Sequence, residues 1–185
     1  MKKISAAVLL IALLIASPAQ AQTKLSKEQG NNYYYNCKSK PDPRMRPESQ
    51  DAMCACTSVM MMEKMTVEEV QVMMGDTPQS RQALNKMLIE VYAPCMNYPV
   101  QDLVGMQCLE DKKIDALGSN VPKEELCGCV AETTAMWFVN EGRALLREVL
   151  VKNPNITDPV GPIMETAKFK KKSYDNLVAC LTKGE

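Results

Sequence analysis

The 185-residue sequence contains no histidine. Histidine is the commonest general base in enzymes and the commonest protein ligand of transition metals. The chain also lacks a glycine-rich phosphate loop and the glycine-flanked serine of esterases. These absences remove the residues on which most hydrolytic, phosphoryl-transfer and metal-dependent reactions depend. We therefore expect a non-enzymatic protein that holds no cofactor.

Long apolar runs are equally scarce, and the one that exists lies at the start of the chain. Residues 8–15 are continuously apolar, which is shorter than the roughly 18 residues of a membrane-spanning helix. Two lysines at positions 2 and 3 precede this run, and Ala-Gln-Ala at 19–21 follows it. This order predicts a cleaved signal peptide over residues 1–21 and a mature chain that begins at Gln22. We expect a periplasmic or secreted protein with no membrane span after cleavage.

The chain has no excess of charge of either sign, with 22 basic and 22 acidic residues. Binding to nucleic acid or to an anionic membrane surface requires a basic patch or a net positive charge. The balance therefore excludes nucleic acid as an expected partner and leaves another protein as the expected one.

Cysteine is the abundant exception, and the eight cysteines form two copies of one pattern. The first copy reads C-x16-C-x-C-x38-C and the second reads C-x18-C-x-C-x50-C. Repetition of this kind predicts an internal duplication, with one unit at 22–97 and the other at 98–185. An even number of cysteines in an exported chain predicts disulfides. The residues concerned are Cys37, Cys54, Cys56, Cys95, Cys108, Cys127, Cys129 and Cys180.

Helical periodicity dominates both halves, and neither contains the alternating pattern of a β-strand. Capping boxes begin at Ser26 and Thr66, and Thr77 precedes a proline suited to a first helical position. Three prolines between positions 41 and 47 predict a loop before a helix that restarts at Ser49. The expected first half has four helices, with Met73 and Met74 facing inward from the third.

The second half repeats this plan with its own breaks. A short link is expected at residues 96–99, and a central helix is expected to start at Lys123 and to break at Gly142. The last helix is expected to begin at Pro162. The predicted fold is all-α, with two tandem disulfide-stapled helical repeats of about four helices each.

The C-x-C spacing predicts how the bridges are arranged. Residues two apart on a helix point roughly 200° apart around its axis, so the two thiols cannot reach the same neighbouring helix. Cys37 and Cys95 should join the 54/56 pair, and Cys108 and Cys180 should join the 127/129 pair. Spacing leaves open which cysteine of each pair takes which partner.

Three other features suggest sites. The cluster of Met60, Met61, Met62 and Met65 offers thioethers that suit Cu(I), although methionine also fills irregular cores or lines adaptable partner grooves. The C-x-C pairs suggest thiol-disulfide exchange. The run Tyr33, Tyr34 and Tyr35 is too wide to bury on one helix face and suggests an interface. We expect an interaction module or accessory scaffold subunit, with soft-metal or thiol handling as the alternative.

Overall fold

A computed structural model describes residues 23–117 and 120–182 of the chain. The predicted signal peptide over residues 1–21 and the predicted first mature residue, Gln22, lie outside these ranges. The described chain is all-helical apart from one isolated antiparallel bridge between Lys24 and Thr66. Its helices are α1 (Lys27–Lys38), α2 (Pro47–Lys64), α3 (Val67–Val72), α4 (Pro78–Lys86), η1 (Met87–Tyr92), η2 (Ala93–Cys95), α5 (Asn97–Glu110), α6 (Lys112–Asp115), α7 (Lys123–Lys152), α8 (Val160–Met164) and α9 (Ala167–Thr182).

The N-terminal capping signals act where the sequence places them. Ser26 accepts from the amide of Gln29, whose side chain accepts from the amide of Ser26 in return. Thr66 and Thr77 cap α3 and α4 in the same reciprocal way. Helix α2 starts at Pro47, two residues before the predicted restart, because proline is tolerated at the first helical position.

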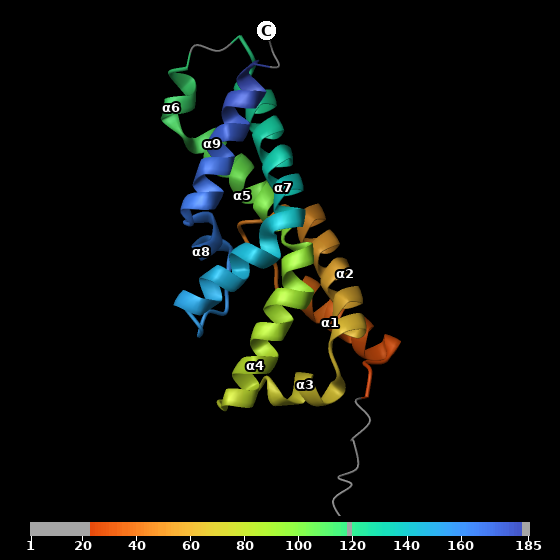
Figure 1. The fold of residues 1–185 in the computed structure, drawn as a ribbon. Helices are drawn as coiled ribbons and strands as arrows, with labels where there is room; N and C mark the ends of the chain where they lie inside the picture. Colours follow the sequence, from red (N-terminus) through yellow and green to blue (C-terminus); the bar gives the residue numbers. More distant parts are fainter. Residues whose placement is uncertain (1–22, 118–119, 183–185) are drawn as a thin grey trace, which may run out of the picture.

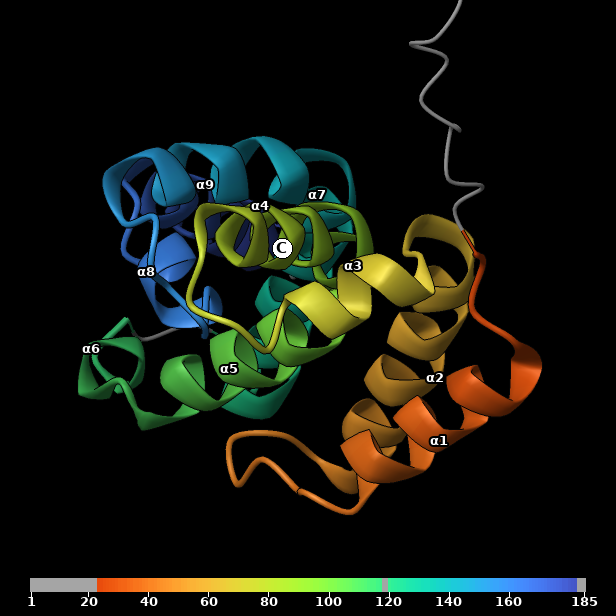
Figure 2. The ribbon, with the colours of Figure 1, turned by 90° about the horizontal axis from the view of Figure 1, so that it is seen from below.

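Helices α1 and α2 form a hairpin that stands to one side of the molecule (Figures 1 and 2). Its apolar contacts form a small core around Met61, Met65 and Val91. Short α3 then leads across to α4 (Figure 2). Met73 is partly buried as predicted, whereas Met74 is 91% exposed, because α3 ends at Val72 and Met74 lies in the turn beyond it.

The expected link at residues 96–99 consists of a turn at Met96 and the start of α5, with Met96 and Pro99 buried and Asn97 and Tyr98 partly buried. The chain passes from α4 through a π-helical turn, η1, and a 3-10 turn, η2, directly into α5. The amide of Val100 donates to the carbonyl of Met96, and both side chains are fully buried. They belong to one core cluster with Leu88 and with residues of α7. Met96 and Val100 are therefore core residues that pack between the two halves of the chain.

The predicted break at Gly142 does not occur, because the 30-residue helix α7 runs through this position. A Cβ added at Gly142 would lie 2.4 Å from Cε1 of Phe138, one turn earlier in the same helix. The glycine therefore gives space to a fully buried aromatic ring and does not end the helix.

Helix α7 is the axis of the larger core. Helix α5 runs antiparallel to it, since Cys108 near the end of α5 is bonded to Cys127 near the start of α7. Helix α9 also runs antiparallel to α7, with Asn176 donating to Thr134 at 2.9 Å. The last helix was predicted from Pro162, but α8 occupies that region and α9 starts after a turn capped by Thr166. None of the helices in the described ranges combines the length and apolarity that a membrane crossing requires.

Four disulfides fix these helices to one another. The first cysteine of each set of four bonds the first of the C-x-C pair, and the last bonds the second of the pair. The structure thus resolves the pairing that spacing left open. The bridges are Cys37–Cys54, Cys56–Cys95, Cys108–Cys127 and Cys129–Cys180.

Candidate functional site

A groove of about 580 Å³ lies along α5 and the start of α7, beside the loop that joins α1 to α2. We call residues 39–46 the proline loop and the cavity the α5–α7 groove. Figure 2 shows the proline loop extending from the hairpin toward α5. The groove is lined by Pro43, Arg44, Met45, Arg46, Gln101, Asp102, Gly105, Met106, Leu109, Glu110, Glu124, Cys127, Gly128 and Ala131.

The floor and walls of the groove are apolar. Gly105, Gly128 and Ala131 offer almost no side chain, so the floor is close to bare helix backbone. Met106 and Leu109 form a wall and are 38% and 45% exposed. They lie outside the stripe of α5 that carries Val100, Leu103 and Val104 into the core. Apolar side chains left in water beside a concave floor are typical of an interaction surface.

Two arginines attach the proline loop to the second half of the chain. Arg46 donates from its backbone amide to Asp102 Oδ2 at 2.7 Å and from Nε to Oδ1 at 2.8 Å. The Asp102 side chain is only 4% exposed, so this carboxylate is enclosed by its partner. Arg44 lies 2.6 Å from Asp42 within the loop and 2.8 Å from Asp158 in the α7–α8 segment. The loop is therefore held at both arginines as a fixed rim of the groove.

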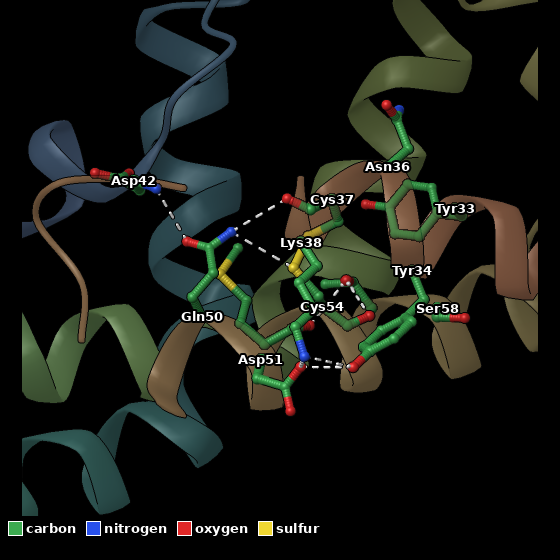
Figure 3. Close-up of a disulfide and its surroundings, with 12 residues drawn as sticks. Tyr33, Tyr34, Asn36, Cys37, Lys38, Asp42, Gln50, Asp51, Cys54 and Ser58 are labelled. Atoms are coloured by element: carbon green, nitrogen blue, oxygen red, sulfur yellow. Dashed lines mark hydrogen bonds and ion pairs between the residues drawn. A yellow bond between two sulfur atoms is a disulfide. The ribbon is translucent and has the colours of Figure 1, made fainter. Parts of the chain in front are cut away.

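The first disulfide supports the other end of this loop (Figure 3). Gln50 accepts from the backbone amide of Asp42 at 3.2 Å and donates to the Cys37 carbonyl at 3.4 Å. Its amide nitrogen also lies 3.5 Å from Sγ of Cys54, which is bonded to Cys37. A chain of contacts therefore runs from the Cys37–Cys54 bridge through Gln50 to the loop.

The arginines that line the groove are paired with aspartates, whereas two of its glutamates are not paired within the described ranges. Hydrogen bonding from Arg44 lowers the pKa of Asp42 below its ordinary value, so this pair is charged at neutral pH. Arg46 forms an ion pair with Asp102 at 2.7 Å. Glu110 and Glu124 lie at the other end, and neither carboxylate makes a hydrogen bond or ion pair within the described part of the chain. The charge that remains free on the groove is negative.

The three predicted tyrosines occupy two environments. Tyr33 and Tyr92 share a hydroxyl–hydroxyl hydrogen bond of 2.9 Å, and burial raises the pKa of Tyr33. Tyr34 donates to Asp51 at 2.5 Å on the hairpin surface, as Figure 3 shows. Tyr35 is 66% exposed. Its ring packs edge-on against that of Tyr34, with centroids 5.1 Å apart, so Tyr34 and Tyr35 form one aromatic surface on the hairpin while Tyr33 turns inward.

Three of the four predicted methionines lie in one core. Met61 and Met65 are buried in the small core, and Met60 packs against it. Met62 contacts α1 at Gly30, where an added Cβ would lie 2.4 Å from its sulfur. These side chains fill the interface between α2 and its neighbours.

A different set of thioethers lines a second cavity. Met45, Met53 and Met96 come from the proline loop, α2 and the η2–α5 junction, and they line about 230 Å³ beside Tyr92. The pair of Arg44 and Asp158 lies at its edge. No group of three or more cysteine or carboxylate side chains suited to a metal ion occurs in the ranges that the structure describes.

All eight cysteines are paired, so any thiol-disulfide exchange would begin at one of the four bridges. Cys54, Cys95 and Cys127 are also almost completely buried. An exchange reaction begins when a thiolate attacks a disulfide sulfur, which requires that sulfur to be accessible.

The residues of the α5–α7 groove were not predicted as a site. Each looks ordinary in sequence, since Met106 and Leu109 read as part of an apolar helix and Gly128 as the small residue of a C-x-C pair. The one signal in the sequence is that Met106 and Leu109 lie off the helix face that carries Val100, Leu103 and Val104. Recognising it requires knowing which face α7 covers.

Comparison with known proteins adds no relative. No protein-family model, no curated protein and no solved structure matches the chain significantly.

Proposed function

We propose that this protein is an exported, non-enzymatic interaction module that binds a protein partner in the α5–α7 groove. The observation that carries the proposal is the exposure of Met106 and Leu109 above a floor of Gly105 and Gly128. Apolar side chains that face water across an open concave surface gain free energy when a partner covers them.

The rigidity of the groove supports this role. The Cys108–Cys127 bridge links the two helices that form the floor, and Arg46 and Asp102 fix the opposite rim. A site that is already formed loses less conformational entropy on binding, so more of the contact energy contributes to affinity. A stapled scaffold with a preformed groove suits an accessory or scaffold subunit.

Export and duplication are part of the same proposal. Disulfides are typical of oxidising compartments, and four of them fit a protein that acts outside the cytosol. The signal peptide over residues 1–21 would deliver it there. The duplication of 22–97 and 98–185 is supported by the shared bridge order and by separations of 17 and 19 residues in the first bridge of each set.

A photo-crosslinking amino acid placed at Met106 tests the proposal in intact cells. We expect a discrete protein adduct at this position, and none from the same group at Val151, which is 85% exposed on the far end of α7. Gly128→Leu, which fills the groove floor, should remove the adduct. Equal labelling at both positions, or an adduct that survives Gly128→Leu, would contradict the groove as the binding surface.

Soft-metal binding is a second candidate function, favoured by the three thioethers of the 230 Å³ cavity. Met45, Met53 and Met96 form a ligand set that suits Cu(I), whose softness matches thioether sulfur. Titration with Ag(I), a redox-stable substitute, should show one site that is lost in the triple Met→Leu variant. Silver binding that survives this variant would contradict the cavity as the site.

A further inference from the structure

We propose that the occupant of the α5–α7 groove is a basic amphipathic helix of the partner, about three turns long. This inference rests on the proposed function and specifies the chemistry of the partner at the same site. It follows from the shape of the groove, the positions of its glycines and the charges at its two ends.

The shape of the groove favours a helix. The α5 residues that line it run from Gln101 to Glu110, which at 1.5 Å per residue is about 14 Å. Both long sides of the floor are helices, so no free strand edge is present there to pair with an extended peptide. A helix satisfies its own backbone and can lay an apolar face into such a groove through residues at i, i+3 or i+4, and i+7.

The glycines on the floor have no internal packing reason. A Cβ at Gly128 would meet nothing within 4 Å, and one at Gly105 would make an ordinary 3.5 Å contact with Ala131. Gly30 and Gly142 differ, because a Cβ there would overlap a neighbour at 2.4 Å. Alanine at positions 105 and 128 would favour both helices, since glycine is a poor helix former. What the glycines provide is a floor low enough for another backbone to come close.

The charges select a basic helix. Both arginines on the rim are bonded to aspartates, while Glu110 and Glu124 have no partner in the described chain. Three acidic residues, Asp102, Glu110 and Glu124, line the groove against two arginines. A lysine or arginine on the partner helix would therefore pair with these carboxylates, and an acidic helix would be repelled.

Designed peptides can test this on the full oxidised chain. The probe is an 18-residue, fluorescently labelled, acetylated peptide of alanine, leucine and lysine, with leucines spaced three and four apart. One control replaces each lysine with glutamate, and a second has the same composition in scrambled order. By fluorescence anisotropy we expect the basic helix to bind at least tenfold more tightly than either control.

Variants of the protein locate the binding. Gly128→Leu should weaken the basic peptide at least tenfold, and circular dichroism and thermal melting should show that the variant is folded, because position 128 has open space and leucine favours helix. Glu110→Lys with Glu124→Lys should weaken it by a similar factor. The matched control is Glu132→Lys with Glu148→Lys, two exposed positions on α7 outside the groove lining, which should change affinity less than twofold.

The outcomes separate this inference from the proposed function. Equal affinity for the basic and acidic peptides, or an equal loss in the control variant, would overturn the basic helix. If the Met106 adduct still forms under either result, the groove remains a binding site for a partner of other chemistry. If the basic peptide binds and is lost in Gly128→Leu, the inference stands on its own measurement, whether or not a cellular adduct is found.

Discussion

The two disulfide-bonded segments of the chain, 23–95 and 97–182, have the same bridge order but differ in how much of the core they build. The first has its own small buried cluster of Met61, Met65 and Val91 and adds Leu88 and Ala93 to the large core, which extends along α7 and includes Phe138 and Leu145. The first segment is a hairpin with short helices attached, and the second is built on one 30-residue helix. The same covalent plan therefore supports a weakly packed region and a strongly packed one.

This difference shows what each region contributes. The hairpin places the proline loop, and the larger core holds α5 and α7 in register beneath it. The loop in turn is bonded to the second segment by the hydrogen bond that Arg46 donates to Asp102. Since the first segment has less buried apolar surface, we expect its structure to depend more on its bridges. The following predictions test this comparison.

Removing a long bridge should have the largest effect, and Cys56–Cys95 is the first case. Its 39-residue separation corresponds to about 4 kcal/mol by loop-closure entropy, and removal of Cys129–Cys180 should cost a similar amount. The regions that unfold should differ, however. Hydrogen exchange should show α1 and α2 unprotected in Cys56→Ala/Cys95→Ala, while α7 keeps protection in Cys129→Ala/Cys180→Ala. Equal loss of protection in both variants would mean that the cores do not differ in the way described.

Alanine at two glycines of α7 should have effects of opposite sign. Gly142→Ala should destabilise the protein by about 1–3 kcal/mol, because the new Cβ overlaps the buried ring of Phe138. Gly128→Ala should stabilise it by about 1 kcal/mol, since helix propensity improves and no neighbour is displaced. Urea denaturation measures both. Destabilisation at position 128 would show that its glycine has a structural role after all.

Leucine at Met61 and Met62 should be tolerated. Volume-conserving swaps in a core usually cost less than about 1.5 kcal/mol, and both side chains act here as packing groups. Thermal melting should shift by a few degrees at most. Silver affinity should match that of the wild-type chain. A lower affinity would indicate that the methionines at 60–62 and 65 form the metal site.

Acidification should release part of the proline loop. Arg44 lowers the pKa of Asp42 in the folded state, so this carboxylate adds stability above its ordinary value near 4, and that stability is lost as the pH falls through the lower folded pKa. The pair is partly exposed, so the effect should be under about 1 kcal/mol. The stability difference between wild type and Asp42→Asn should be present at pH 7 and shrink toward pH 3. A constant difference would show that Asp42 acts without its charge.

The all-helical class, the caps at Ser26, Thr66 and Thr77 and the presence of disulfides were predictable from sequence. A capping box is recognised from residues three apart, and a C-x-C pair constrains its partners through the turn angle of one helix. The internal duplication, the export signal and the partner remain predictions. Gly142 was predicted wrongly, since a glycine that ends a helix and one that makes room for a ring look the same in sequence.

By itself, therefore, the sequence determined the local features of this protein, because helix starts, turns and cysteine order depend on neighbours along the chain. Only the tertiary structure decided that Met96 and Pro99 are buried and that the proline loop, α5 and the start of α7 enclose a groove. Those outcomes depend on which helix face is covered by another element. Met106 and Val104 lie two residues apart on one helix, and only the position of α7 makes one a wall and the other core.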